Sequence, residues 1–178
     1  MSSFNFSTSE LLLVIDIKST GVDASDDIIA IGFCAMTYDR ETVKKYRCGM
    51  KLRTTEEIHR MHNGQLSWYD LWKRRGYNID CFNRFWRKRV DKLDKLQDEN
   101  YIKLLNTRVD LAFEINRILV EIERMCQKLT IVTNTVAFDT VQVGRLLANE
   151  HLQPLHYSRN GEYRWLYHTI PNISLSAN

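Results

Sequence analysis

The sequence predicts an α/β fold in which a central mixed sheet of about five strands is flanked by helices. Three apolar or alternating runs joined by turns open the chain, segments with helical periodicity follow, and a further apolar run and a helix come after them. Alternation of strands with helices is typical of a sheet covered by helices. We expect a single domain over residues 1–178, with 1–9 and 171–178 as loose termini, because this length suits one hydrophobic core.

The first three strands follow from apolar runs and the turns between them. Residues 11–17 form a continuous apolar run that stops at the polar "DIKSTG". Residues 28–37 and 43–52 are the next two predicted strands, because "YDRET" between them contains the turn former Asp39. Such short connections predict an antiparallel meander.

Helical periodicity dominates the middle of the chain. We expect residues 54–76 to be irregular or loosely helical and residues 81–96 and 100–127 to form amphipathic helices, since apolar residues recur there every three or four positions. "LTIVTNT" at 129–135 predicts a strand, and a helix follows after Asp139 and ends near His151. "RNG" between two aromatic runs in the tail predicts a hairpin or a pair of short edge strands.

Composition excludes several classes of protein. Hydrophobic residues make up 44% and charged residues 26%, as in an ordinary globular domain. The longest apolar run, Leu11–Ile15, is far shorter than the roughly 18 residues that cross a bilayer. Without a signal peptide or membrane span, we expect the cytoplasm or nucleus of a host cell. The four widely spaced cysteines lack metal-binding pairs, which predicts reduced thiols.

Two stretches place acidic residues where a strand ends. "VIDIKSTGVDASDDIIAIG" carries Asp16 followed by Ser19, Thr20 and Gly21, and "TNTVAFDTVQVGRLL" carries Asp139 ahead of a helix. Together they resemble the first two motifs of the proofreading-type 3′-to-5′ exonucleases of the DEDD superfamily. The resemblance spans residues 9–170, is closest to viral and phage members, and implies a ribonuclease H-like exonuclease fold.

The resemblance also implies a chemistry that this sequence does not fully support. In that family four carboxylates hold two divalent cations, Mg²⁺ or Mn²⁺, about 4 Å apart on a phosphodiester, and a His or Tyr positions or deprotonates the attacking water. Asp16 and Asp139 match two of these acids, but Lys18 stands at the position of the family's glutamate. The only acids after Asp139 are Glu150 and Glu162. We therefore expect a degenerate, catalytically inactive domain that binds no metal, with Asp16 and Asp139 as the metal ligands if it is active.

Lys18 lies two residues beyond Asp16 and so on the same face of the predicted strand. We expect its ammonium to pair with the carboxylates that remain and, with Thr20, to contact a backbone phosphate. Simpler interpretations stay open at this point. In these interpretations Lys18 is an ordinary surface lysine, Asp16 only caps a turn, and Asp139 is only the N-cap of the following helix.

A basic and aromatic stretch suggests the ligand. Between Trp72 and Lys95 nine Lys or Arg stand against three Asp, a mixture that suits single-stranded nucleic acid. The candidate contacts are Lys73, Arg74, Arg75, Arg84, Arg87, Lys88 and Arg89. The alternative is an ordinary amphipathic helix, and the spacing of Phe82, Phe85 and Trp86 predicts that these aromatic side chains are buried. His59 and His62 have no acidic or cysteine partner nearby, so we expect no metal site there.

The function predicted from sequence is binding of nucleic acid, single-stranded rather than double-stranded, or of a protein partner. One alternative is an active exonuclease whose missing acids come from a second subunit, from Asp23, Asp26 or Asp27, or from an aspartate beyond Asn178 in a longer natural chain. Another is a scaffold protein that assembles through a sheet edge or the basic helix. The choice between DNA and RNA, the partner and the oligomeric state do not follow from the sequence.

Overall fold

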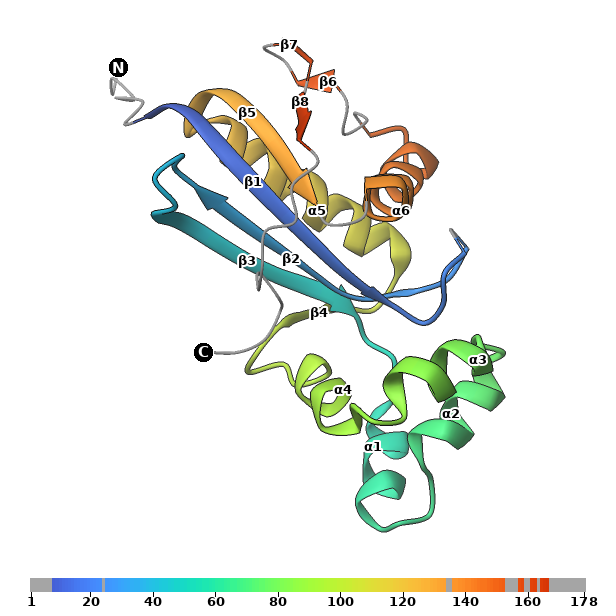
Figure 1. Cartoon of the computed structure of the whole chain (residues 1–178). Coiled ribbons are helices and arrows are strands. Elements are labelled where there is room, and N and C mark those ends of the chain that lie inside the picture. Colours follow the sequence, from blue (N-terminus) through green and yellow to red (C-terminus); the bar gives the residue numbers. More distant parts are fainter. Residues whose placement is uncertain are drawn as a thin grey trace.

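The structure, a computed structural model, describes residues 8–23, 25–133, 136–152, 157–158, 161–162 and 164–166. Its main element is a six-stranded mixed sheet (Figure 1). From edge to edge the strands are β4 (Lys103–Leu105), β3 (Thr42–Met50), β2 (Ile28–Met36), β1 (Thr8–Ser19), β5 (Cys126–Thr133) and β8 (Arg164–Leu166). The predicted α/β fold with a mixed sheet is confirmed.

Strands β1, β2 and β3 form the predicted antiparallel meander. Ile15 pairs with Phe33, and Phe33 pairs in turn with Tyr46. β1 begins before the predicted residue 11 because its first residues pair in parallel with β5, from Thr8 opposite Cys126 onward. β4 and β8 also pair in parallel, with β3 and β5 respectively, which makes the sheet mixed.

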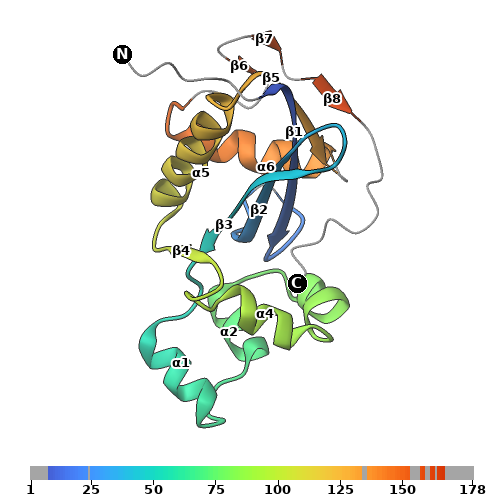
Figure 2. The same ribbon diagram turned by 90° about the vertical axis from the view of Figure 1, so that its left-hand side faces the viewer.

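Two helices, α5 (Arg108–Glu123) and α6 (Val136–Asn149), lie on the same face of the sheet (Figures 1 and 2). Alternate residues of β1 such as Leu13 and Ile15 join Ile115 of α5 in the main buried cluster. The opposite face of the described sheet carries a smaller apolar cluster, Leu12, Val14, Cys34, Met36 and Val132. The sheet is therefore apolar on both faces.

The helix predicted over 100–127 is shorter than expected. Residues 103–105 form β4, and α5 begins only at Arg108. Thr107 determines this start, because its side chain accepts a hydrogen bond from the backbone N–H of Asp110 at 3.1 Å.

A helical segment between β3 and β4 lies beyond the ends of the central strands (Figure 1). It contains α1 (Thr55–His62), α2 (Trp68–Arg75), α3 (Ile79–Cys81), a π-helical turn η1 (Phe82–Trp86) and α4 (Val90–Leu96). Residues 54–76, expected to be irregular or loosely helical, form two regular helices, because Thr54 with Glu57 and Ser67 with Asp70 form capping boxes that start them. The helix predicted over 81–96 is divided by η1. None of the helices in the described ranges is long and apolar enough to span a membrane.

Aromatic rings form the core of this segment. Trp72 and Trp86 are fully buried, and the Trp72 ring lies 5.2 Å from that of Phe82 and 6.4 Å from that of Trp86. Phe85 is half-buried and meets Trp86 edge to face at 4.8 Å. The predicted burial of the aromatic side chains is confirmed for Phe82 and Trp86 and is partial for Phe85.

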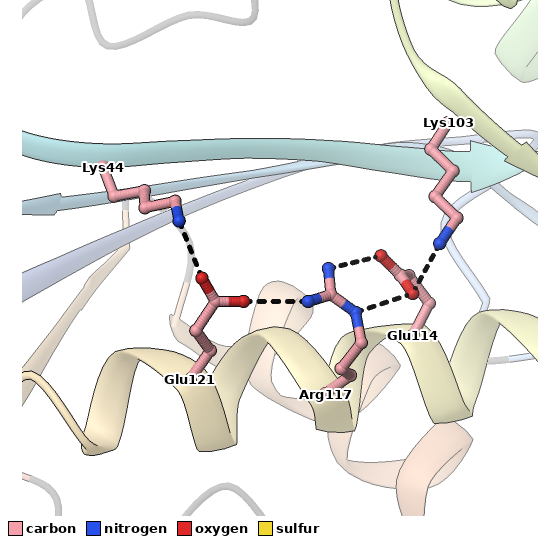
Figure 3. Close-up of polar contacts among 5 residues, drawn as sticks. All are labelled: Lys44, Lys103, Glu114, Arg117 and Glu121. Carbon is pink, nitrogen blue, oxygen red and sulfur yellow. Dashed lines mark hydrogen bonds and ion pairs between the residues drawn. The ribbon is translucent and has the colours of Figure 1, made fainter. Parts of the chain in front are cut away.

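Alternating charges join α5 to the strands β3 and β4 (Figure 3). Glu114 accepts hydrogen bonds from Arg117 at 2.8 and 3.1 Å and from Lys103 at 2.9 Å. Arg117 also donates to Glu121 at 2.8 Å, and Glu121 accepts from Lys44 at 2.7 Å. This ion-pair chain, as we call these five residues, ties one side of α5 to the sheet.

Short strands also occur in the tail. β6 (Tyr157–Ser158) and β7 (Gly161–Glu162) pair antiparallel, as predicted for the residues that flank the "RNG" turn. Arg159 and Asn160 of that turn lie outside the described residues.

Candidate nucleic-acid-binding site

Asp16 and Lys18 lie near the end of β1, on the sheet face opposite the main core. Their partners in β2 are Gly32 and Ala30. In an antiparallel pair, residues directly opposite each other point to the same face. Because Gly32 has no side chain and Ala30 only a methyl group, the two charged side chains meet without a bulky neighbour on β2.

Lys18 and Asp16 form a bidentate ion pair. The Lys18 Nζ donates to both carboxylate oxygens of Asp16, at 2.8 and 2.9 Å. The two side chains are only 17% and 19% exposed. The predicted pairing of Lys18 with a carboxylate is thus present. Among the described residues it does not extend to Asp139. One ammonium therefore contacts both oxygens of the Asp16 carboxylate.

Asp139 is buried in the first turn of α6. Its carboxylate accepts a hydrogen bond from the Thr133 hydroxyl. The helix begins at Val136, so Asp139 is not its N-cap, and that simpler interpretation is wrong. Thr133 pairs in the sheet with Ile15, the residue before Asp16. Asp139, on α6, is therefore held at the end of β5, next to the part of β1 that carries Asp16.

The loop acids have structural partners of their own. Asp26 accepts a hydrogen bond from the backbone N–H of Asp23 at 2.7 Å, and its carboxylate fills the space beside Gly21 that a Cβ would need. Asp27 pairs with Arg108 at 2.7 Å. Within the described part of the chain, no group of three or more His, Cys, Asp or Glu residues is arranged to hold a metal ion. His59 and His62 of α1 likewise belong to no such group among the described residues.

Thr20 is placed differently from the prediction. It is fully buried, and its hydroxyl accepts a hydrogen bond from the backbone N–H of Asp27 at 3.0 Å. Its own N–H donates to the Asp27 carbonyl at 2.9 Å. The Thr20 side chain therefore closes the loop after β1 and is not accessible to a nucleic acid.

The predicted basic contacts divide into two groups, all exposed. Lys73, Arg74 and Arg75 end α2, where Arg75 donates to both oxygens of Glu57 at 2.8 and 3.0 Å. The second group, which we call the η1 basic surface, consists of Arg84, Arg87, Lys88 and Arg89. Its Arg89 stacks on the Phe85 ring at 4.3 Å and donates to the Phe85 carbonyl at 2.8 Å.

One hydrogen bond joins η1 to the end of β1. The buried Trp86 indole N–H donates to the carbonyl of Ser19 at 3.1 Å, across 67 positions of sequence. The next helix, α4, brings Lys92 close enough to Lys18 and Asp16 for their charges to act on it. Burial lowers the pKa of Lys92, the Lys18 ammonium lowers it further, and the Asp16 carboxylate acts in the opposite direction.

In the sequence, Lys92 is only one of the nine Lys or Arg residues between Trp72 and Lys95. Nothing in its immediate neighbours distinguishes it from a solvated lysine on a helix, and the only signal was that local excess of positive charge. The charges of Lys18 and Asp16 reach it because α4 packs its Leu93 and Leu96 into the main core.

The helical segment also encloses a cleft of about 1360 Å³. Its walls include the half-buried Arg53, which stacks on Trp68 at 4.4 Å and pairs with Asp94 at 3.1 Å. Acidic and basic side chains line it in equal number: Lys51, Arg53 and Arg87 against Asp94, Asp98 and Glu99. Because these charges balance, the cleft has no net positive charge that would attract a polyanion.

No family model and no curated protein sequence matches the chain. Solved structures of exonuclease I do match it in shape, each with a TM-score of 0.50. The Escherichia coli enzyme bound to a dA16 oligonucleotide is 13% identical and is matched over 88% of this chain and 28% of that chain. Its zinc-ion-bound complex with single-stranded DNA is 12% identical, over 89% and 28%.

A complex of exonuclease I with SSB-Ct is 13% identical, over 88% of this chain and 28% of that chain. The chain thus spans less than a third of the length of these proteins. At this level of identity the likeness concerns the fold alone. The chain therefore has the ribonuclease H-like α/β fold found in exonuclease I.

Proposed function

We propose that this chain is an exonuclease-fold domain that binds single-stranded nucleic acid and does not hydrolyse it. The observation that carries the proposal is the bidentate pair in which Lys18 occupies both oxygens of Asp16. Two divalent cations on a phosphodiester need several carboxylate oxygens that converge on them. Here one of the two family acids is neutralised by an ammonium instead.

The other acids near the site support the same conclusion. Asp26 accepts a hydrogen bond from the Asp23 backbone and Asp27 pairs with Arg108, so both carboxylates already have structural partners. Asp139 is buried against Thr133. The donor set of the described residues does not fit a pair of Mg²⁺ or Mn²⁺ ions, and we derive no hydrolytic step from it.

Charge and fold favour nucleic acid as the ligand. The η1 basic surface is exposed and makes no ion pair with any described carboxylate, so its cations are available to phosphates. Trp86 holds this surface against the strand that ends in the Lys18–Asp16 pair. Exonuclease I, whose fold the chain shares, is seen in complexes with single-stranded DNA.

Two measurements test the proposal. Labelled single-stranded DNA and RNA, incubated with the protein and Mg²⁺ or Mn²⁺, should keep their length. Shortening that disappears in Asp139→Ala would overturn the inactive assignment. Binding to the same strands should weaken steeply as salt rises from about 50 to about 200 mM. Absence of binding at the lower salt concentration would refute the nucleic-acid ligand and favour a protein partner or scaffold role.

A further inference from the structure

We propose that Tyr69, Asn83 and Arg87, which all line the cleft of the helical segment, form a subsite for one unpaired base of the bound strand. The Tyr69 ring stacks on the base, Asn83 hydrogen-bonds to the edge of the base, and Arg87 contacts the neighbouring phosphate. The inference rests on the proposed function and names what the site recognises beyond the phosphates of the strand.

Phe82 brings these three residues together. Its buried ring meets the Tyr69 ring edge to face, with 5.8 Å between the centroids. Asn83 is the next residue along the chain. The backbone N–H of Arg87 donates to the Phe82 carbonyl at 2.8 Å, the bond across five residues that is typical of a π-helical turn. Tyr69 of α2 and the two residues from η1 and its end therefore border the same part of the cleft.

Tyr69 presents an aromatic ring that the core leaves partly open. Its side chain is 41% exposed, whereas Trp68 and Trp72 of the same helix are buried. Within the described part of the chain, its ring contact is the edge-to-face one with Phe82. Because every base has a π-face, an exposed ring of this kind stacks on an unpaired base of any sequence.

Asn83 supplies the hydrogen-bonding groups. Its side chain is exposed, lines the cleft and makes no hydrogen bond with any residue in the described ranges. A primary amide carries both donors and an acceptor, and the edges of unpaired bases present both kinds of partner. Asn83 can therefore bind a base edge without giving up a contact within the fold.

The cleft suits an uncharged base better than a phosphate. At about 1360 Å³ it exceeds the roughly 300–1,000 Å³ of common ligand pockets, so a base with its sugar fits. Lys51 pairs with Glu99 at 2.8 Å and Arg53 with Asp94 at 3.1 Å, so these four charges cancel.

Arg87 connects the cleft to the phosphates. It lines the cleft and also belongs to the η1 basic surface, where it is exposed and makes no ion pair with any described carboxylate. A cation beside a cleft whose other charges cancel matches the charge pattern of a nucleotide, which joins a neutral base to an anionic phosphate.

An abasic strand isolates the contact with the base. Fluorescence anisotropy compares fluorescein-labelled oligo(dT) with an abasic strand of the same length, in EDTA and across a salt series. The two strands carry the same phosphate charges, but only oligo(dT) can stack. We expect the wild type to bind oligo(dT) about tenfold more tightly, as for one base stacked on an aromatic side chain.

Three substitutions assign the roles. Tyr69→Leu, which keeps an apolar side chain against Phe82, should weaken oligo(dT) binding about tenfold and leave the abasic strand unaffected, whereas Tyr69→Phe should bind like the wild type. Asn83→Ala should weaken oligo(dT) binding alone, about fivefold. Arg87→Gln should weaken binding of both strands and make the slope of log affinity against log salt about 0.7 less negative, the value for one phosphate contact.

Tyr38→Leu is the matched control. Tyr38 is also an exposed tyrosine, but it follows β2, donates to Glu10 at 3.0 Å and does not line the cleft. We expect this variant to bind both strands like the wild type. Thermal unfolding checks the fold of each variant, and Asn83→Ala tests the base contact without changing the aromatic core.

The outcomes separate the two proposals. If the wild type binds neither strand at low salt, the proposed function itself fails. If the wild type binds both strands equally and Tyr69→Leu and Asn83→Ala change nothing, the base subsite is wrong and the proposed function stands on phosphate contacts. If Tyr69→Leu and Asn83→Ala weaken the two strands alike, these residues do not contact a base, and the inference is likewise refuted.

Discussion

Replacing Glu114 with glutamine measures how much the ion-pair chain of Figure 3 stabilises the fold. The Glu114 side chain is only 9% exposed and accepts three charge-assisted hydrogen bonds from Arg117 and Lys103. Removing one partner from a buried pair costs roughly 3–5 kcal/mol when the other charge stays buried. Lys103 and Arg117 are 56% and 52% exposed, so water can hydrate them in the variant.

We therefore expect Glu114→Gln to lower the free energy of unfolding by about 2 kcal/mol at neutral pH. In a chain of this size that corresponds to a fall in Tm of roughly 4–8 °C, measured by circular dichroism. Glu99→Gln is the control, because Glu99 also pairs with a lysine but is 66% exposed. Its effect should stay below about 1 kcal/mol. Equal shifts in the two variants would refute the reasoning.

The pH dependence gives a second readout of the same substitution. Hydrogen bonds from Arg117 lower the pKa of Glu114, and the hydrogen bond from Lys44 is the main cause that lowers the pKa of Glu121 to about 2. A carboxylate whose pKa is lowered by folding stabilises the native state above its unfolded pKa of about 4.3. That stabilisation is lost as pH falls through the folded pKa. The Tm of the wild type should thus fall between pH 4.3 and about 2, and that of Glu114→Gln should fall less over the same range. Parallel curves would contradict this account.

Two further predictions concern the sheet and the site. Gly49→Ala should destabilise the protein by about 2 kcal/mol or more, because a Cβ there would lie 2.0 Å from the backbone oxygen of Ile29. Gly144→Ala on α6 should instead stabilise it by about 1 kcal/mol, because the added Cβ meets open space and alanine favours a helix. Denaturant unfolding measures both, and a stable Gly49→Ala would show that β2 and β3 are less closely packed. Lys18→Glu should raise the affinity for Mn²⁺ slightly, by calorimetry, without restoring cleavage of a labelled strand. Cleavage by this variant would mean that the remaining ligands suffice for catalysis.

Local periodicity determined much of the fold and part of the site. The apolar run before Asp16 has to be a core strand, and alternation along that strand puts Lys18 on the same face as Asp16. That shared face made the ion pair between them predictable, and the structure contains it. The burial of Phe82 and Trp86 follows in the same way from helical spacing. These features depend on neighbours within about four positions, which the sequence displays directly.

Only the tertiary structure decided which charges meet. Thr20 was expected at the surface, yet it is buried because Asp27 supplies both partners of its hydrogen bonds. The hydrogen bond between Trp86 and Ser19, 67 positions apart, brings η1 and its basic residues to the end of β1. Whether a charge is solvated, paired or left facing a like charge depends on elements distant in sequence, and local pattern carries no information about them.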